Sequence, residues 1–265
     1  MMKFDPFFQV PQFSLNTSEG DVALPILYFD ASALYAFFLV EKSRSEAQLV
    51  GTGLVPDLCI GKYTIAAFAC YEYRDTTVGV YNEVGLALAA CPEGEQKEFG
   101  SWWDFLRTFT VPEERHTGMH VLHLPVTTAA ANAAGREIWG FPKFVTPIEF
   151  KKEGRAFKCA VRDPGSLNQI ATLEGTMGLG VPMRPLSLAL YSNLDHQVVR
   201  CTVNARGKSY LHSGGSLKLT LNGGSHPMAA AIAALGLEDA KPIAILSSDA
   251  FQSRLNAGVP LQIAV

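Results

Sequence analysis

One lysine near the middle of the chain has almost entirely apolar neighbours. Residues 135–145 read GREIWGFPKFV, so Lys143 follows Phe and Pro and precedes Phe and Val. Burial disfavours the charged form of an ammonium group, and a lysine in such surroundings can present a free, nucleophilic amine. Formation of a Schiff base with a carbonyl compound requires such an amine. The commoner structural interpretation is a lysine whose stem lies on an apolar strand while its ammonium group reaches solvent.

Two polar side chains with complementary chemistry lie two positions apart earlier in the chain. Residues 78–83 read VGVYNE, and side chains two positions apart share one face of a β-strand. If that face lines a barrel, Tyr81 and Glu83 present a phenol and a carboxylate to one cavity. A carboxylate can move protons, and a phenol can hold a carbonyl or hydroxyl oxygen. The alternative is a polar cross-strand pair on a solvated face.

Both segments resemble one known family. GREIWGFPK resembles the signature of the acetoacetate decarboxylase family, whose typical form is Gly-Arg-Glu, three residues, an aromatic residue, Pro and Lys. The lysine that ends the signature forms the substrate imine in that family, so the resemblance implies this role for Lys143. Residues 78–83 are similar to the family strand that ends in an active-site glutamate, which implies Glu83 as the second catalytic residue. The similarity covers roughly residues 30–255, including the strand at 242–248.

The residues around the lysine and the glutamate supply candidates for substrate binding. Trp139 and Phe141 alternate with Lys143 and share its face if the segment is extended, either as pocket walls or as core. Arg136 and Glu137 also fit structural partners at the end of a helix. The residues expected to contact substrate are Tyr81, Trp139, Phe141, Phe144 and Arg136.

Three positions depart from the family pattern. The family enzymes have a second lysine directly after the imine-forming one, where this chain has Phe144. They also have an arginine on an early strand, whereas no arginine precedes Arg44 here. A second family glutamate falls near Phe68, with Glu72 as a nearby carboxylate. We therefore expect imine chemistry to be retained, with desolvation in place of a neighbouring cation, and acetoacetate itself to be a poor substrate.

The expected activity is that of a cofactor-independent carbon–carbon lyase acting on a small keto acid. The reaction is of the decarboxylase type, through a lysine imine and an enamine. An aldolase-dehydratase that starts from pyruvate or another 2-oxo acid and uses the same lysine is the first alternative. A barrel that binds an apolar small molecule without turnover is the second. The family resemblance also implies a homo-oligomer.

Composition and residue spacing argue against several partners and ligands of the protein. The 265 residues carry a net charge of −3, which indicates no nucleic-acid or membrane partner. Five scattered cysteines without CxxC spacing predict free thiols. Because the first residues also lack a signal-peptide pattern, we expect a cytoplasmic protein. Histidines at positions 116, 120 and 123 are not predicted to bind a metal, because Gly118 interrupts the helix that their spacing would need.

Short strands must position these residues. Hydrophobic residues are 48% and charged residues 18% of the chain, which excludes a disordered protein, and frequent Gly and Pro indicate many turns. An alanine-rich helix is predicted at 127–135, with Thr127 or Thr128 as its N-cap and Gly135 as its stop signal, and further helices at 45–50 and 225–235. Strands are predicted at 22–29, 33–40, 63–73, 78–90, 121–124, 146–151, 156–162, 170–175, 198–203, 217–221 and 243–246.

The fold class that follows is α+β. It is mainly antiparallel β and barrel-like, as in the cone-shaped barrel that the family resemblance implies, with a few short helices. Residues 1–265 form a single domain, with an irregular lead-in at 1–20 and an insertion loop at 91–115.

Overall fold

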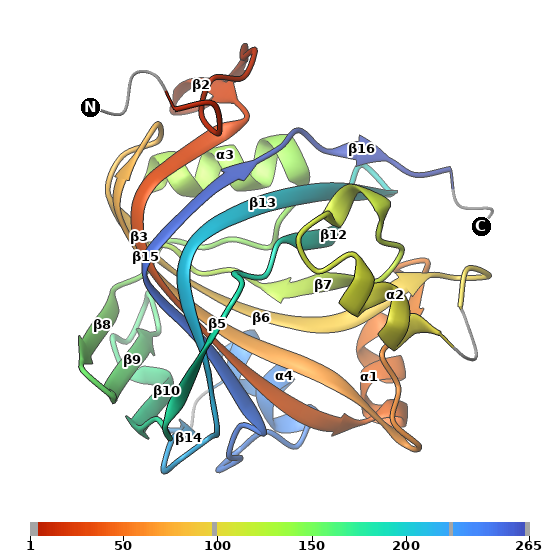
Figure 1. Cartoon of the computed structure of the whole chain (residues 1–265), viewed down its shortest axis with the longest axis vertical. Helices are drawn as coiled ribbons and strands as arrows, with labels where there is room; N and C mark the ends of the chain where they lie inside the picture. Colours follow the sequence, from red (N-terminus) through yellow and green to blue (C-terminus); the bar gives the residue numbers. More distant parts are fainter. Residues whose placement is uncertain (1–4, 97–99, 223–224, 263–265) are drawn as a thin grey trace.

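Seven strands close into a barrel in the computed structural model, which describes residues 5–96, 100–222 and 225–262 (Figure 1). Strand β13 pairs with both β12 and β15 and so completes the ring. Neighbouring barrel strands are antiparallel except β7 and β12, which are parallel. The expected α+β, mainly antiparallel barrel is therefore confirmed. In ring order the strands are β3 (Ile26–Glu41), β5 (Tyr63–Thr76), β6 (Tyr81–Pro92), β7 (Gly118–His123), β12 (Leu188–Leu194), β13 (Gln197–His212) and β15 (Ala244–Leu255).

Smaller elements extend or cover the barrel. A separate four-stranded sheet lies against its outside, at the lower left of Figure 1, in the order β14 (Lys218–Leu221), β10 (Gln169–Thr176), β9 (Ala156–Arg162) and β8 (Ile148–Glu153). The short strands are β1 (Phe13–Thr17), β2 (Gly20–Leu24), β4 (Leu54–Pro56), β11 (Gly180–Met183) and β16 (Val259–Pro260). The helices are α1 (Lys42–Leu49), α2 (Ser101–Arg107), α3 (Ala129–Trp139), α4 (Pro227–Ala234) and the 3-10 turn η1 (Pro112–Glu114). Within the described ranges, no helix has the length and apolar character needed to cross a bilayer.

Strands β3, β5 and β6 are buried on both faces. In β6, Val84, Leu86 and Leu88 point outward into a core shared with the small sheet and α4, whereas Glu83 and Gly85 face the barrel interior. Strands covered on both sides read as nearly continuous apolar runs. The same arrangement explains why the sequence of these three strands is so hydrophobic.

Helix α3 ends later than its sequence predicts. Thr128 caps its first turn by accepting a hydrogen bond from the Ala131 amide, as expected. Gly135 is not the stop signal, because the helix continues through Trp139 and ends at Gly140, whose φ of 70° is left-handed. A left-handed residue closes a helix by bringing its amide back to the last carbonyls, and glycine adopts it without strain. The Gly140 amide accordingly bonds to the carbonyls of Arg136 and Gly135.

The lead-in and the predicted insertion are more regular than expected. An irregular lead-in through residue 20 is wrong for residues 13–17, which form β1 and pair with β2 in a hairpin. The runs at 22–29 and 33–40 are joined, because β3 is one strand of 16 residues. Within 91–115, β6 continues to Pro92, and α2 and η1 follow.

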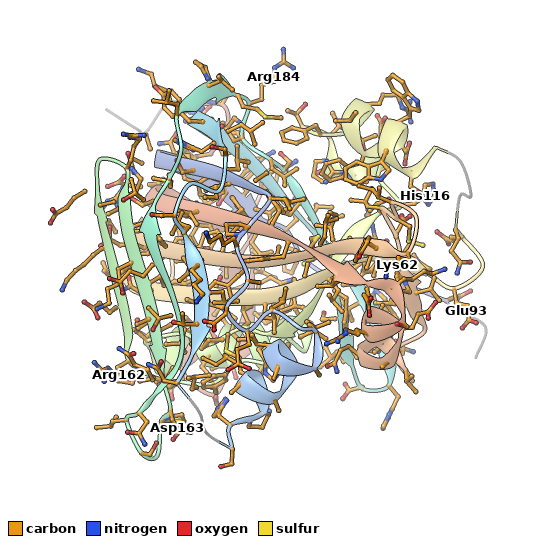
Figure 2. The ribbon with its side chains drawn as sticks, turned by 90° about the horizontal axis from the view of Figure 1, so that it is seen from below. Lys62, Glu93, His116, Arg162, Asp163 and Arg184 are labelled. Atoms are coloured by element: carbon orange, nitrogen blue, oxygen red, sulfur yellow. The ribbon has the colours of Figure 1, made fainter. Side chains whose placement is uncertain are left out.

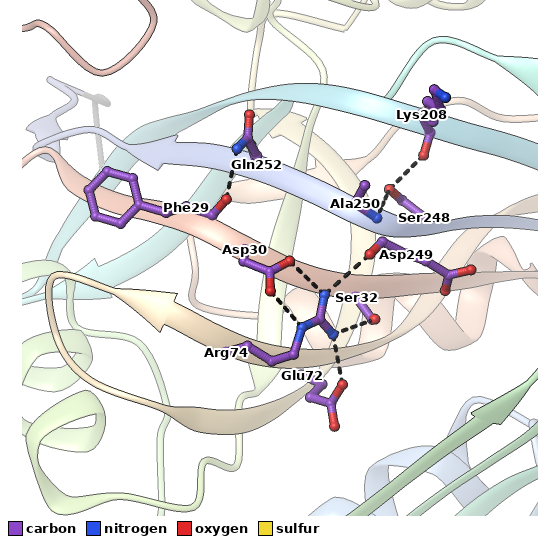
Figure 3. A network of polar contacts seen from close by, with 10 residues as sticks. All are labelled: Phe29, Asp30, Ser32, Glu72, Arg74, Lys208, Ser248, Asp249, Ala250 and Gln252. Carbon is purple, nitrogen blue, oxygen red and sulfur yellow. Dashed lines mark hydrogen bonds and ion pairs between the residues drawn. The ribbon is translucent and has the colours of Figure 1, made fainter. Parts of the chain in front are cut away.

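A polar network on the outside of the barrel fastens β3, β5 and β15 together (Figure 3). The Arg74 guanidinium on β5 donates to both carboxylate oxygens of Asp30 at 2.8 and 2.9 Å and to Glu72 at 2.8 Å. It also donates to the Ser32 hydroxyl at 2.7 Å and to the Asp249 carbonyl at 3.2 Å. The strand register shifts beside Asp30 and next to Asp249, so the network holds the three strands where their regular ladder is interrupted.

Candidate active site

Lys143 and Glu83 form a buried ion pair at the wall of the barrel interior. The Lys143 Nζ atom lies 2.6 Å from Glu83 Oε2, and each residue is only 7% exposed. Charged side chains such as Lys62 and Glu93, in contrast, lie on the outside of the molecule (Figure 2). The apolar surroundings oppose any unpaired charge, so each of the two groups depends on the other as its charge partner. Proton transfer within the pair yields a neutral amine and a carboxylic acid at no change in net charge.

The backbone on both sides of Lys143 is held by hydrogen bonds. The Leu124 amide donates to the Pro142 carbonyl at 3.1 Å, and the Val126 amide donates to the Phe144 carbonyl at 3.0 Å. Arg136, one helical turn before the end of α3, donates from Nη1 to the Lys143 carbonyl at 2.9 Å. The lysine is therefore anchored to a strand-like segment and a helix at once, which fixes the origin of its flexible side chain.

Gly135 gives the lysine stem its path past α3. A Cβ atom built at Gly135 would lie 2.3 Å from Lys143 Cε and 2.4 Å from Cδ, which is far inside van der Waals contact. Only a residue without a side chain lets the stem run against the helix and reach Glu83. Gly135, the first residue of GREIWGFPK, is thus required because the Lys143 side chain packs against it. It does not serve to end the helix.

Tyrosines surround the ion pair. The Tyr73 hydroxyl donates to Glu83 Oε1 at 3.4 Å, and its ring stacks on that of Tyr71 with centroids 5.3 Å apart. The hydroxyls of Tyr28 and Tyr81 lie 3.1 Å apart, and the Tyr81 ring faces the Lys143 amine at 5.8 Å. Burial, as the main cause, raises the pKa of all four phenols, so they remain protonated hydrogen-bond donors.

The pair opens on an apolar cavity of about 260 Å³ inside the barrel. Small inward-facing residues in the middle of β5 and β6 leave this space empty of side chains, namely Ala67, Ala69, Gly85 and Ala87. Aromatic and aliphatic side chains form most of the remaining wall. Among the described residues that line the cavity, the charged ones are Lys143, Glu83 and Arg115.

Arg115 is a buried arginine whose contacts hold the segment around α2 in place. It is 3% exposed and donates to the Ser187 carbonyl at 2.9 Å, to the Thr108 hydroxyl at 3.1 Å and to the Thr108 carbonyl. Its guanidinium lies over the Phe105 ring at 4.8 Å. Burial lowers the pKa of Arg115 to about 10. Sequence analysis missed this residue because it ends a segment interpreted as a loop.

The residues proposed from sequence as substrate contacts lie in different places. Phe141 lines the cavity, and Tyr81 lies behind Lys143 in a second, much smaller pocket. Trp139 also lines that smaller pocket, but as the last residue of α3 it does not alternate with Lys143, and its Nε1 donates to the Asn256 carbonyl at 3.1 Å. Phe144 points away from the cavity, against the His226 ring at 4.7 Å. Arg136 binds the Lys143 carbonyl and does not line either pocket.

Sequence analysis also missed the tyrosine wall. Tyr28, Tyr35, Tyr71 and Tyr73 all line the cavity. The period of two between Tyr71 and Tyr73 is a signal that both share one face of a strand. This spacing does not show which face of the strand is the interior, because the other face is not uniformly polar. That face carries Glu72 and Arg74, which pair on the outside, but also the buried Cys70.

Comparison with known proteins identifies the family. Residues 12–235 match the family model described as acetoacetate decarboxylase (ADC), so the chain belongs to the acetoacetate decarboxylase family. Among curated proteins, no sequence matches this chain.

Solved structures share the fold at low sequence identity. An acetoacetate decarboxylase from Legionella pneumophila subsp. pneumophila str. Philadelphia 1 is 16% identical with a TM-score of 0.65, covering 97% of this chain and 94% of that one. The enduracididine biosynthesis enzyme MppR complexed with pyruvate is 15% identical with a TM-score of 0.62, covering 96% and 99%. An acetoacetate decarboxylase-like enzyme from Sphingomonas wittichii RW1 is 12% identical with a TM-score of 0.58, covering 89% and 92%.

Proposed function

We propose that the protein is a cofactor-independent lyase whose Lys143 forms an imine with the keto group of its substrate. The observation that carries this proposal is the 2.6 Å pair of Lys143 and Glu83, buried at the wall of an apolar cavity. Membership of the acetoacetate decarboxylase family supports an enzyme of this kind. A buried lysine with a carboxylate partner has both the nucleophile and the proton carrier that imine formation needs.

The reaction begins when Lys143 passes a proton to Glu83 and its free amine attacks the keto carbon. The carbonyl oxygen leaves as water, and the protonated imine then withdraws electrons from the neighbouring carbon–carbon bond. In a β-keto acid that bond breaks with loss of carbon dioxide and leaves an enamine. Glu83 gave up its proton when water left, so it takes another from solvent and passes it to the enamine carbon. Water then hydrolyses the imine, which releases the ketone and restores the Lys143–Glu83 pair. Tyr73 Oη, 3.4 Å from Glu83 Oε1, orients the carboxylate in this cycle.

Aldol condensation followed by dehydration is the second candidate for the same lysine. The pyruvate complex of MppR, which shares the fold, favours it, as does Phe144 at the position of the second family lysine. In this reaction the pyruvate-derived enamine attacks an aldehyde, and water is then eliminated. Measurement of carbon dioxide release distinguishes the two reactions, because only the decarboxylase releases it.

Borohydride trapping tests the proposal directly. Incubation with a panel of keto acids and sodium borohydride should add the mass of the reduced adduct to the peptide that contains Lys143. Lys143→Met should abolish the adduct, whereas Lys62→Met, which removes a 70% exposed lysine, should retain it. An adduct that persists in Lys143→Met, or that forms only on other lysines, would contradict the assignment and leave a non-catalytic binding barrel.

The role of Glu83 is tested by separating imine formation from turnover. Glu83→Gln keeps the size of the side chain and removes its ability to carry a proton. We expect this variant still to be trapped by borohydride, though more slowly, because Lys143 can also lose its proton to water. Turnover should fall by about 100-fold or more, within the usual range for a general acid–base residue. Exchange of solvent deuterium into a bound ketone should slow in parallel. Equal loss of trapping and turnover would instead make Glu83 necessary only for holding Lys143.

A further inference from the structure

The empty volume beside the ion pair is large for a small keto acid. An apolar cavity of about 150 Å³ accommodates benzene, so a cavity of this size has room for a body of roughly ten carbon atoms. Pyruvate and acetoacetate are about the size of benzene, so either of them at Lys143 would leave roughly a third of the 260 Å³ unfilled. The space is created by four small residues on two adjacent strands, Ala67, Ala69, Gly85 and Ala87, and not by a single missing side chain.

The walls offer apolar contact and little to hold a carboxylate. Lys143 is neutralised by Glu83, and Arg115 already donates to oxygens of Thr108 and Ser187. Among the described residues that line the cavity, no cation is free to pair with the carboxylate of a small keto acid. Such an acid would therefore bring an additional negative charge into apolar surroundings. Burial of an unpaired charge is costly. Contact between the cavity wall and an apolar part of the substrate, remote from the reacting atoms, can offset that cost.

The cavity leads away from Lys143 toward a partly exposed apolar rim. Ile243, before β15, lines it and is 50% exposed, and Phe37 on β3 and Leu211 on β13 line it as half-buried residues. Trp102 and Phe105 of α2 complete the lining on this side. An elongated apolar molecule can thus extend from the lysine to the rim in contact with apolar side chains throughout.

One polar group along this path, the Tyr35 hydroxyl, makes no hydrogen bond of normal geometry within the described residues, although the Tyr71 hydroxyl is close enough to interact with it. The Tyr35 side chain on β3 lines the cavity and is 4% exposed. The Tyr71 ring meets it edge-on with centroids 5.6 Å apart. An unsatisfied buried hydroxyl is costly, and burial raises the pKa of Tyr35, so the group remains a protonated donor.

We propose that the substrate is a keto acid with an extended apolar body that carries a second, uncharged oxygen. Its keto group reaches Lys143, its apolar body fills the cavity, and its second oxygen accepts a hydrogen bond from Tyr35. This inference rests on the proposed function for the identity of the reacting keto group. The geometry of the cavity, in contrast, is independent of whether Lys143 reacts.

Binding to an unreactive variant tests the shape of the substrate. Lys143→Met cannot form an imine, and calorimetry with methyl ketones of increasing chain length measures cavity binding alone. We expect affinity to rise about fourfold for each added methylene until the cavity is filled. Ala87→Leu should stop this rise at a shorter chain, whereas Ala47→Leu on exposed α1 should leave it unchanged. Affinity that does not rise with chain length would overturn the inference.

The role of Tyr35 is tested with paired ligands that differ in one oxygen. In the Lys143→Met background, Tyr35→Phe should weaken a hydroxy- or diketone about tenfold relative to the plain ketone of equal length, while Tyr210→Phe, at a residue outside the cavity, should not. Equal effects on both ligands would overturn the assignment to Tyr35. If the length dependence holds while borohydride traps nothing on Lys143 in the unmodified protein, the proposed function fails and the ligand class stands.

Discussion

At the scale of single residues, the position of the Lys143 amine depends on a neighbouring residue that has no side chain. Lys143 reaches Glu83 because Gly135 has no side chain, and the peptide after it is fixed by Arg136. The motif that carries the lysine is therefore a packing arrangement as well as the segment proposed to be catalytic. Its glycine and arginine position the amine that we propose as the nucleophile.

Gly135→Ala should separate activity from stability. The added methyl group would overlap the end of the Lys143 side chain, which is flexible, and would leave the backbone of α3 in place. Alanine favours a helix over glycine by about 0.5–1 kcal/mol, so the melting temperature should not fall. Displacement of the amine by about 1 Å can reduce the rate of turnover roughly 100-fold.

The matched control for this change is Gly165→Ala, at a position where the added Cβ meets only Asp163 at 3.4 Å. Borohydride trapping and thermal unfolding should be measured on both variants. Full trapping by Gly135→Ala would mean that the stem of Lys143 has an alternative path to the cavity.

At the scale of elements, periodicity and capping patterns in the sequence predicted helices and strands. They could not tell the inward face of a strand from its outward face where both faces are buried. Lys143 and Glu83 were identified from their motifs, and the structure pairs them. The inward positions of β5 could not be told from the outward ones, since Phe68 and Cys70 outside are as buried as Ala69 and Tyr71 inside. The end of α3 was misplaced because Gly135 is read as a stop signal from sequence, whereas its role is to contact a side chain distant in space.

Arg74 provides a prediction about how strands are held together. Arg74→Met would leave Asp30 and Glu72 as neighbouring carboxylates without their shared cation, and would release the contact to the β15 backbone. We expect the free energy of unfolding to fall by about 1–3 kcal/mol in urea titrations, more than for an isolated surface pair.

Lys62→Met is the control. It breaks the exposed contact to Glu41 at 3.2 Å and a cation–π contact to the Tyr63 ring, and should cost less than about 1 kcal/mol. Similar losses for the two variants would show that the network in Figure 3 adds nothing beyond an ordinary surface pair.

At the scale of the whole molecule, we expect the free energy of unfolding to fall as the pH drops below about 6.5, before the carboxylates become protonated. Burial lowers the pKa of both His120 and His123 from 6.5 to about 4, and the Nδ1 atom of His120 has no partner within the described residues. Between these values the unfolded chain binds protons that the folded protein excludes. Stability is therefore complete above about pH 6.5 and is lost progressively as the pH falls toward 4.

Urea titrations across this range measure the effect. His120 should account for up to about 3 kcal/mol of the loss, at 1.36 kcal/mol per unit of pKa. His120→Gln has no titrating ring, so its stability should change less between pH 7 and pH 4 than that of the unmodified protein. An identical slope for both proteins would contradict the assignment.

The strands that are covered on both sides have a consequence for how specificity can change. A residue such as Leu86 packs against the outer core, and its neighbours Gly85 and Ala87 form the wall of the cavity. A substitution that changes the volume of a side chain in the outer core moves the strand. The moved strand then changes the shape of the cavity, because densely packed interiors transmit strain. Libraries for altered ligand preference should therefore include the outer core, and divergence among natural relatives can retune selectivity through positions that never meet the ligand.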